Sequence, residues 1–462
     1  MNSNQITLTD MFCGCGGSSQ GAKKVAGVEV KYALNHWKLA IESHNTNHPD
    51  THHDCADISE THPARYNRTT GLIASPECTK HSGGSGKKRK NLNQQDIFQN
   101  KAFDPSAIKS RATMWDVPRF AEIHNYEFII TENVVEVRDW IMWDAWLKAM
   151  HLLGYQHECV YLNAQFAHGE GISGFSPQSR DRIYVVFWKK GNKKPNLQIR
   201  PKAPCIRCGE VEAYQAWKPK SPKYGKYKKQ YIYQCSICNT EVVPYYYAAL
   251  NAVDFTIPMV RIADRHKLKM KDLCDNTIAR IKYGLQKYSK PTTEVNNSYL
   301  FEPFVLETAY THSKSDRTRS LMNVLMTQTT QQSLGMVTPF FGIHHGNSKV
   351  HSAEDPLSTV TTGGIHSSII LAPYHGKKQA SLVLDPTSTI PTKDSISLIE
   401  TAPKIEDCYF RMLQPSETAK AQGFPSDYVI LGSKKLQQRQ IGNANPPPTM
   451  ELLVSRCVAS LT

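Results

Sequence analysis

The sequence lacks any long hydrophobic run. No apolar stretch among the 462 residues reaches the roughly 18–20 residues needed to cross a bilayer, and the Asn/Thr-rich amino end has no signal-peptide core. We therefore expect no membrane segment and a cytoplasmic location. Without an export signal, the twelve cysteines are expected to be free thiols or metal ligands and not a disulfide framework.

Acidic residues are scarce relative to basic ones. The 55 Lys and Arg minus the 41 Asp and Glu give a formal charge of +14 at pH 7. Between Lys189 and Lys229, thirteen basic residues face only two acids, Glu210 and Glu212, which is a net +11. This excess predicts a polyanionic partner, either a nucleic acid or an acidic surface. Hydrophobic residues make up 40% of the chain, which excludes a disordered protein.

Residues 1–190 alternate short apolar runs with longer amphipathic stretches such as 140–153. This alternation predicts an α/β fold with a mostly parallel sheet, in which ligands lie outside the carboxyl ends of the strands. The four runs predicted as strands are Ile6–Phe12, Leu72–Ser75, Phe128–Thr131 and Ile183–Phe187.

The middle of the chain has a different texture. Residues 191–240 are basic, aromatic and proline-rich, and residues from about 300 to 400 are Thr/Ser-rich and β-like. Asp355–Thr359 recurs as Asp385–Thr389, which favours two similar hairpins in one β-rich domain. Helical patterning returns in the last sixty residues, where Pro415 begins a predicted helix.

A glycine-rich segment, Asp10–Gly17, follows the first predicted strand. Glycines there let a ligand approach the backbone, and a following helix offers unpaired N–H groups. The spacing is neither the dinucleotide-binding pattern nor a P-loop. A tight structural turn explains this segment equally well.

Ser75-Pro-Glu-Cys78 closes the second predicted strand and precedes a basic, glycine-rich loop. Positive charge and helix-end dipoles activate a thiol, so Cys78 is a candidate nucleophile. A buried inert thiol is the alternative.

Two further motifs end or enter predicted strands. Glu132 terminates an apolar strand, where an apolar setting favours a protonated carboxyl that can donate near neutrality; a solvated strand-end glutamate is the alternative. Gln178-Ser-Arg-Asp-Arg182 enters the fourth strand, and period-two spacing places Arg180 and Arg182 on one face. Ordinary surface ion pairs would also explain these arginines.

The basic segment contains two Cys-x-x-Cys pairs separated by twenty-six residues. Two such pairs are typical of a tetrahedral structural zinc site, with redox pairs or free thiols as the alternative. Lysines and tyrosines alternate between them, which favours contact with phosphates and stacking on bases over a merely solvated hairpin. The predicted zinc ligands are Cys205, Cys208, Cys235 and Cys238.

Four of these motifs, in their order along the chain, resemble those of the C5-cytosine DNA methyltransferase family. They are Asp10–Gly17, the segment Ser75–Cys78, Glu132–Val134 and Gln178–Arg182. Two further family signatures follow as Arg411–Pro425 and Gln440–Ala444. The resemblance covers about 1–190 and 405–462. It implies a Rossmann-like, S-adenosylmethionine-dependent methyltransferase domain built from these two ranges, and a β-rich target-recognition domain over 191–404. The zinc ribbon would lie in the latter, at about 203–240.

The resemblance also implies a mechanism. Cys78 would add to C6 of a cytosine flipped from duplex DNA, protonated Glu132 would bond N3, and Arg182, with Arg180 alongside, would hold O2 and the loop. Trp37 would stack on the cofactor adenine and Asp57 would accept from its amino group. The residues expected to line the cofactor site are Asp10, Phe12, Gly14, Gly16, Gly17, His36, Trp37, Asp57, Ile58 and Asn443.

Departures from the family pattern leave alternatives open. Glu77 and Thr79 flank the nucleophile, and His36 or Asn35 stands where the family has a ribose-binding acid. A tRNA cytosine-5 methyltransferase and a catalytically silent DNA-binding relative are the alternatives. The expected protein is a bacterial or phage-encoded monomer that acts on double-stranded DNA. A cognate restriction endonuclease is a further candidate partner, which would make the protein part of a restriction-modification system.

Overall fold

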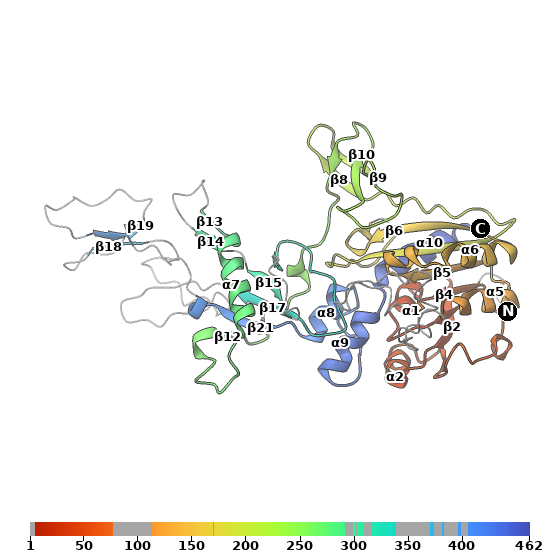
Figure 1. Cartoon of the computed structure of the whole chain (residues 1–462), viewed down its shortest axis with the longest axis horizontal. Coiled ribbons are helices and arrows are strands. Elements are labelled where there is room, and N and C mark those ends of the chain that lie inside the picture. Colours follow the sequence, from red (N-terminus) through yellow and green to blue (C-terminus); the bar gives the residue numbers. More distant parts are fainter. Residues whose placement is uncertain are drawn as a thin grey trace, which may run out of the picture. The chain divides into compact units, whose positions relative to one another are not determined.

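A computed structural model describes residues 5–76, 113–169, 171–291, 299–301, 303–308, 317–338, 370–373, 381–382, 396–398 and 405–462. The chain forms two compact units, and their helices and strands are labelled in Figure 1. Unit 1 draws on residues 1–252, 324–331 and 414–462, and unit 2 on residues 253–323 and 332–413.

Unit 1 is built on a seven-stranded sheet with strand order β3-β2-β1-β4-β5-β7-β6. Strands β1 to β5 are parallel, which confirms the predicted mostly parallel sheet, while β7 runs antiparallel to both β5 and β6. The strands are β1 (Ile6–Met11), β2 (Val28–Leu34), β3 (His52–Asp54), β4 (Gly71–Ala74), β5 (Phe128–Asn133), β6 (Tyr155–Asn163) and β7 (Asp181–Lys189).

The central strands of this sheet are buried on both faces. Every residue of β4 and β5 is buried, which is why these strands read as continuous apolar runs in the sequence. All four predicted strands are present, as β1, β4, β5 and β7. The sequence did not single out β6, whose first half carries polar and partly exposed residues.

Helices connect and cover the strands of unit 1. They are α1 (Gly17–Ala22), α2 (Lys38–Asn47), α5 (Asp116–His124), α6 (Trp143–Leu152), α8 (Pro415–Ala421), α9 (Lys434–Asn443) and α10 (Pro447–Val458). The predicted helix start at Pro415 is confirmed. It is stabilised by a capping box in which Glu417 accepts a 2.7 Å hydrogen bond from the backbone N–H of Gln414.

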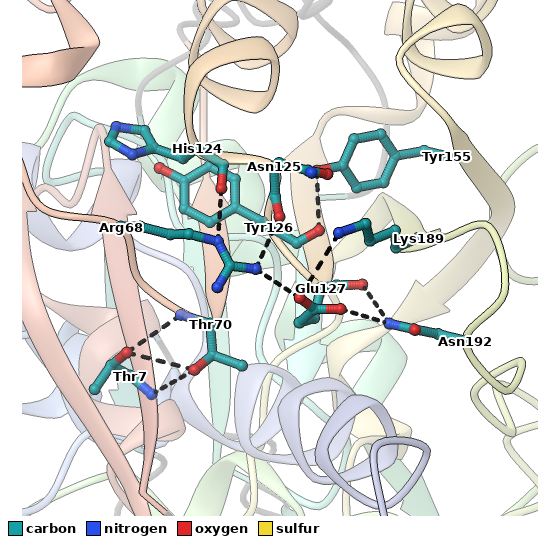
Figure 2. A network of polar contacts seen from close by, with 10 residues as sticks. All are labelled: Thr7, Arg68, Thr70, His124, Asn125, Tyr126, Glu127, Tyr155, Lys189 and Asn192. Atoms are coloured by element: carbon teal, nitrogen blue, oxygen red, sulfur yellow. Dashed lines mark hydrogen bonds and ion pairs between the residues drawn. The ribbon is translucent and has the colours of Figure 1, made fainter. Parts of the chain in front are cut away.

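A polar network ties strands together at the edge of the sheet opposite the parallel strands' carboxyl ends (Figure 2). Glu127, just before β5, accepts hydrogen bonds from Arg68 at 2.5 Å and from Asn192 at 2.9 Å. Burial alone would raise the pKa of Glu127, but these hydrogen bonds outweigh it and hold that pKa below its usual value. The polar side chains at this edge therefore stabilise the fold, and we look for the active site at the opposite edge, where the parallel strands have their carboxyl ends.

The two Cys-x-x-Cys pairs lie on a small antiparallel sheet with order β11-β10-β9-β8. Its strands are β8 (Lys202–Cys205), β9 (Gly209–Trp217), β10 (Tyr231–Cys235) and β11 (Glu241–Val242). The rings of Phe166 and Tyr233 meet at 5.1 Å and those of Tyr161 and Trp217 at 5.5 Å, so this sheet shares the core of unit 1.

This packing divides the chain differently from the sequence-based boundaries. Residues 191–252 fall in unit 1 with the large sheet, whereas 405–413 fall in unit 2. The reason is that Tyr231 and Tyr233 are buried core residues, although the alternation of lysine and tyrosine had suggested a surface that stacks on bases.

Unit 2 is rich in short strands. Its main sheet is antiparallel, with order β12-β21-β17-β15-β16, and α7 (Asp275–Tyr288) packs on it through Ile281 and Leu285. The strands of unit 2 are β12 (Val260–Arg261), β13 (Ser289–Pro291), β14 (Tyr299–Phe301), β15 (Phe304–Glu307), β16 (Thr318–Ser320), β17 (Leu334–Thr338), β18 (Ile370–Pro373), β19 (Ser381–Leu382), β20 (Ile396–Leu398) and β21 (Tyr409–Met412). The repeated Asp-Pro segments lie outside the described residues.

Within the described ranges, no helix is both long enough and apolar enough to span a bilayer.

Helices α1 and α10 approach closely at Gly21. A Cβ added there would lie 2.1 Å from the carbonyl oxygen of Pro447 and 2.9 Å from the backbone nitrogen of Glu451, and neither backbone atom moves easily. We predict that Gly21→Ala lowers the free energy of unfolding by about 1–3 kcal/mol through overpacking. Urea titration followed by circular dichroism measures this. Lys24→Ala, at an exposed position nearby, should change it by less than about 0.5 kcal/mol; equal effects of the two substitutions would contradict the prediction.

Candidate active site

The carboxyl ends of the parallel strands meet at one edge of the large sheet. Met11 of β1 pairs with Leu34 of β2 on one side and with Ala74 of β4 on the other, and Leu34 pairs with Asp54 of β3. The loops after these four strands therefore leave from neighbouring positions. The chain reverses its direction of strand addition between β1 and β4, which is the switch point where such sheets bind ligands.

Glu132 and Arg182 form an ion pair at this edge. Arg182 Nε lies 2.8 Å from Glu132 Oε1, and Glu132 is 8% exposed. Because β7 is antiparallel to β5, its first residues lie beside the last residues of β5, with Asn133 paired to Ile183. The fold thus brings together two motifs that are fifty residues apart, and both were predicted as site residues.

Arg180 has a different role from Arg182. It is 2% exposed, and its guanidinium donates to three backbone carbonyls, those of Gln328, Gly442 and Ala444, at 3.0–3.3 Å. Arg180 therefore anchors the end of α9 to the start of β7. Its expected part, beside Arg182, in holding cytosine O2 and the loop stays a prediction.

Asn445 is a buried residue at this edge that the sequence interpretation missed. The amide is oriented so that its oxygen and its nitrogen both find partners. The oxygen accepts from the hydroxyls of Ser18 at 2.9 Å and Ser75 at 2.8 Å, and the nitrogen donates to both carboxylate oxygens of Glu132 at 3.2 Å. It connects α1, the segment after β4 and the end of β5 to the start of α10. Asn443, the predicted residue of this segment, is exposed at the end of α9. The sequence Asn443-Ala-Asn445 offers two asparagines in this motif, and this was the signal from which Asn445 could have been considered.

The glycine-rich loop after β1 has two different sides. Phe12, Gly14 and Gly16 all adopt left-handed backbone angles, with φ of 59°, 54° and 98°. A Cβ on Gly16 would lie 2.4 Å from the hydroxyl of Tyr428, and one on Gly17 would lie 2.1 Å from the carbonyl oxygen of Asn445, whereas a Cβ on Gly14 would meet nothing within 4 Å. One side of the loop is therefore packed and the other, at Gly14, faces open space.

Beneath this loop lies a chain of buried polar side chains. Ser19 donates to Asp10 Oδ2 at 2.7 Å, His44 Nε2 lies 2.9 Å from the Ser19 hydroxyl, and His44 Nδ1 lies 2.7 Å from His53 Nε2. Burial raises the pKa of Asp10 to about 7, against the lowering effect of the Ser19 hydrogen bond, and holds the pKa of His44 well below its usual value. A neutral His44 that donates to Ser19 and accepts from His53 satisfies both of its ring nitrogens, whereas Asp10 Oδ1 is buried without a hydrogen-bond partner among the described residues.

The remaining predicted cofactor residues follow β2 and β3 at the same edge. His36 is exposed, and the backbone N–H of Trp37 donates to Asn35 Oδ1 at 2.9 Å. Asp57 accepts from the backbone N–H of Ser59 at 3.2 Å, and Ile58 is buried. The guanidinium of Arg439 lies over the ring of Trp37, 4.7 Å from its centroid, a position not foreseen from the sequence.

The predicted nucleophile, Cys78, and its neighbours Glu77 and Thr79 lie outside the described residues. The described chain stops at Pro76, whose carbonyl oxygen accepts from Asn133 Nδ2 at 3.4 Å. Ser75 bonds to the backbone of β1 through its N–H, which donates to the Met11 carbonyl oxygen at 3.1 Å. The segment carrying Cys78 therefore starts between β1 and Glu132.

The four cysteines of the small sheet are gathered in one place. Their sulfur atoms all lie within 4.8 Å of one another, with Cys205 and Cys238 at 3.5 Å. The backbone N–H groups of Ile237 and Cys238 both donate to Cys235 Sγ at 3.4 Å, an arrangement that stabilises a thiolate. The predicted set of metal-ligating residues is thus brought together.

Residues 6–459 match the sequence profile of the C-5 cytosine-specific DNA methylase family. The chain belongs to this family. No curated protein sequence matches the chain. Among solved structures it is similar to a candidate DNA modification methyltransferase encoded within an E. coli prophage, with 15% identity, 98% of both chains covered and a TM-score of 0.44. It is also similar to the Entamoeba histolytica methyltransferase EhMeth, with 11% identity, 99% of both chains covered and a TM-score of 0.47. For S. pombe Dnmt2 the identity is 13%, with 99% of this chain and 100% of that chain covered and a TM-score of 0.47.

Members of the C-5 cytosine-specific DNA methylase family depend on S-adenosylmethionine, and the carboxyl edge fits such a ligand. Gly14 leaves open the side of the loop where a Cβ would otherwise stand, and it lies at the switch point of the sheet. The segments after β2 and β3 start beside this loop in register.

The buried Asp10 makes a pH-dependent contribution to the stability of this family member. Its pKa of about 7 in the folded chain lies above its ordinary value of 3.8, so the stabilising effect of the protonated form is complete below about pH 4 and is lost as the pH rises to 7. Asp10→Asn keeps an acceptor for Ser19 but cannot ionise. We predict that the stability of Asp10→Asn relative to wild type increases with pH between 4 and 7, by up to about 1.4 kcal/mol per unit.

Urea unfolding of both proteins at several pH values measures this difference. Stability curves that run parallel across this range would show that Asp10 is ionised throughout.

Proposed function

We propose that the chain transfers a methyl group from S-adenosylmethionine to C5 of a flipped cytosine in duplex DNA, through a covalent adduct with Cys78. The observation that carries this proposal is the buried Glu132–Arg182 pair at the carboxyl edge. Pro76, the last described residue before the predicted nucleophile, accepts a hydrogen bond from Asn133, the neighbour of Glu132, in a chain of the cytosine-C5 family.

The chemistry needs a nucleophile because C5 of cytosine is a poor one unaided. Addition of the Cys78 thiolate to C6 moves electron density onto C5, which then attacks the methyl group. S-adenosylmethionine supplies that methyl group in electrophilic form when bound. The methyl donor leaves as S-adenosylhomocysteine. Loss of the C5 proton to water then restores the C5–C6 double bond and expels the thiolate, so the cysteine is regenerated.

Glu132 and Arg182 stabilise the negative charge that spreads over the pyrimidine during addition. In this proposal Glu132 takes up a proton from solvent and exchanges its contact with Arg182 for a hydrogen bond donated to N3, while Arg182 donates to O2. Asn445, whose amide lies 3.2 Å from both carboxylate oxygens, orients Glu132 for this contact. The two groups can reach these atoms only in a base removed from the duplex, which is why the substrate must be flipped.

The cofactor is held by the loops after β1, β2 and β3. In this proposal Trp37 stacks on the adenine, Asp57 accepts from its amino group, and Gly14 provides the open space beside the backbone. The other residues proposed to line this site are Asp10, Phe12, Gly16, Gly17, His36, Ile58 and Asn443.

DNA is favoured over tRNA by the basic segment and by the presence of a second, β-rich unit. Ten of the thirteen basic side chains between Lys189 and Lys229 are exposed and so can meet phosphates. Unit 2 provides the additional protein surface that reading base edges requires. A tRNA cytosine-5 methyltransferase remains the alternative function.

The four-cysteine sheet is proposed to be a zinc ribbon. Zinc prefers four thiolates at about 2.3 Å, and a closed Cys₄ set is a structural and not a catalytic site. The clustered sulfurs and the two N–H donors to Cys235 suit this ion.

We predict methyl incorporation from labelled S-adenosylmethionine into duplex DNA and not into tRNA. Cys78→Ala should lower the rate by about a thousandfold or more, because the nucleophile is lost. Trapping on DNA containing 5-fluorocytosine, which cannot release the adduct, measures the covalent step separately. Incorporation into tRNA alone would replace DNA by RNA as the substrate, and incorporation into neither polymer by wild-type protein that binds DNA would support the catalytically silent alternative.

Zinc analysis tests the ribbon. We predict one zinc ion per chain by atomic emission spectroscopy, and its loss in Cys235→Ser. Cys457→Ser, at a buried cysteine outside the cluster, is the matched control and should retain the metal. A metal-free wild-type protein purified without chelators would contradict the zinc ribbon.

A further inference from the structure

The segment that joins β9 to β10, residues 218–230, is called here the basic hairpin. It carries six lysines, which suggest a purely electrostatic role. Four of them, Lys220, Lys223, Lys228 and Lys229, are exposed. Lys226 is different, because its Nζ lies 2.6 Å from Glu136 Oε1 and both side chains are largely shielded from solvent.

Three contacts connect the basic hairpin to the large sheet. Besides the Lys226–Glu136 pair, the backbone N–H of Tyr227 donates to Asp181 Oδ1 at 2.9 Å, and the Tyr224 hydroxyl donates to Asp139 Oδ1 at 3.2 Å. The acceptors lie in the one-turn helix Val135–Asp139, directly after β5, and at the first residue of β7. The hairpin therefore holds both segments that carry the buried ion pair.

Asp181 and Glu136 are close in sequence to the reactive groups. Asp181 stands between the two arginines, and its carbonyl oxygen accepts from Arg182 Nη1 at 2.9 Å. Glu136 lies four residues after Glu132, in the short helix that directly follows β5. A shift of either segment would move a member of the pair relative to the other.

The base of the hairpin is fixed by the four-cysteine sheet. Strand β10 starts at Tyr231, where the hairpin ends, and finishes at Cys235 in the cysteine cluster. Tyr231 and Tyr233 are buried, and Gln215 Nε2 of the neighbouring strand donates to the Tyr161 carbonyl oxygen of β6 at 3.1 Å. A continuous path of backbone and packed rings thus runs from the metal-binding cysteines to the catalytic edge.

We propose that the four-cysteine module is a brace for the Glu132–Arg182 pair, with Lys226 and Asp181 as positioning residues. This inference rests on the proposed function and deepens it. The module then does more than place charge near DNA: a filled metal site keeps the two strand ends in the geometry that the reaction needs. Within the hairpin, the inward side positions the catalytic pair and the outward lysines meet phosphates.

Paired substitutions of two lysines in the same hairpin separate these roles. Lys226→Met removes the contact with Glu136, and we expect kcat at saturating DNA to fall on the order of tenfold or more, because small displacements of catalytic groups are costly. The KM values for DNA and for S-adenosylmethionine should change little. Lys229→Met removes an exposed charge and should raise the KM for DNA and lower the salt dependence of binding by about one phosphate contact, with its main effect outside kcat.

A reversal of the ion pair provides the rescue. Glu136→Lys combined with Lys226→Glu should raise kcat again toward the wild-type value, whereas each single change should lower it. Lys226→Arg keeps the charge and should remain close to wild type. If Lys226→Met instead raises the KM for DNA as Lys229→Met does, with kcat unchanged, Lys226 is an ordinary phosphate contact and the brace is refuted.

Hydrogen exchange of the full-length protein tests the brace without relying on activity. Peptides covering 130–138 and 179–184 should exchange faster in Lys226→Met, and in wild-type protein stripped of metal, than in untreated wild type; Lys229→Met should leave them unchanged. Unaltered exchange in both peptides would overturn the brace. Faster exchange in Lys226→Met, together with a wild-type protein that methylates no nucleic acid, would overturn the proposed function and leave the brace standing.

Discussion

The antiparallel pairing of β5 with β7 is the constraint on which the candidate active site depends. Both strands are buried over most of their length, so a one-residue slip of their register would turn each side chain to the opposite face of the sheet, where the packing does not fit it. That register sets Glu132 beside the start of β7, where Arg182 reaches it. A buried ion pair contributes little net stability, because desolvation offsets the Coulomb attraction. The pair is therefore held in place by the sheet, and its value to the protein lies in geometry.

Much of the catalytic unit could be predicted from the sequence, because its signals are local. A strand buried on both faces is a continuous apolar run, as at β4 and β5, and the positive φ angles after β1 require glycine at two of three positions. The division of labour between Arg180 and Arg182 could not be predicted, since it depends on carbonyls contributed by Gln328, Gly442 and Ala444, far away in the sequence. The role of Asn445 could not be predicted either, because its partners Ser18, Ser75 and Glu132 are also far away in the sequence.

In the basic segment, the lysines and the tyrosines have different roles that composition alone does not separate. Its charge suggested a surface for phosphates, and its tyrosines a surface for bases, yet Tyr231 and Tyr233 point into the core that they share with Phe166. Their period-two spacing on β10, with Ile232 between them, is typical of a strand with one buried face. Charge and aromatic content therefore describe opposite sides of the same module, and only the packing distinguishes them.

The hydrogen bonds of Asn445 also have a consequence for biosynthesis. Ser18 and Asn445 are 427 residues apart, and helix α10, which follows Asn445, packs against α1 at Gly21. Contacts of such long range form late, and a chain emerging from the ribosome folds its amino-terminal parts first. Glu132 and Arg182 will have been translated well before Gly442, Ala444 and Asn445 exist to hold them. A nascent or prematurely terminated chain thus lacks an assembled carboxyl edge, so the methyltransferase activity expected of this family member would begin only with nearly full-length translation products.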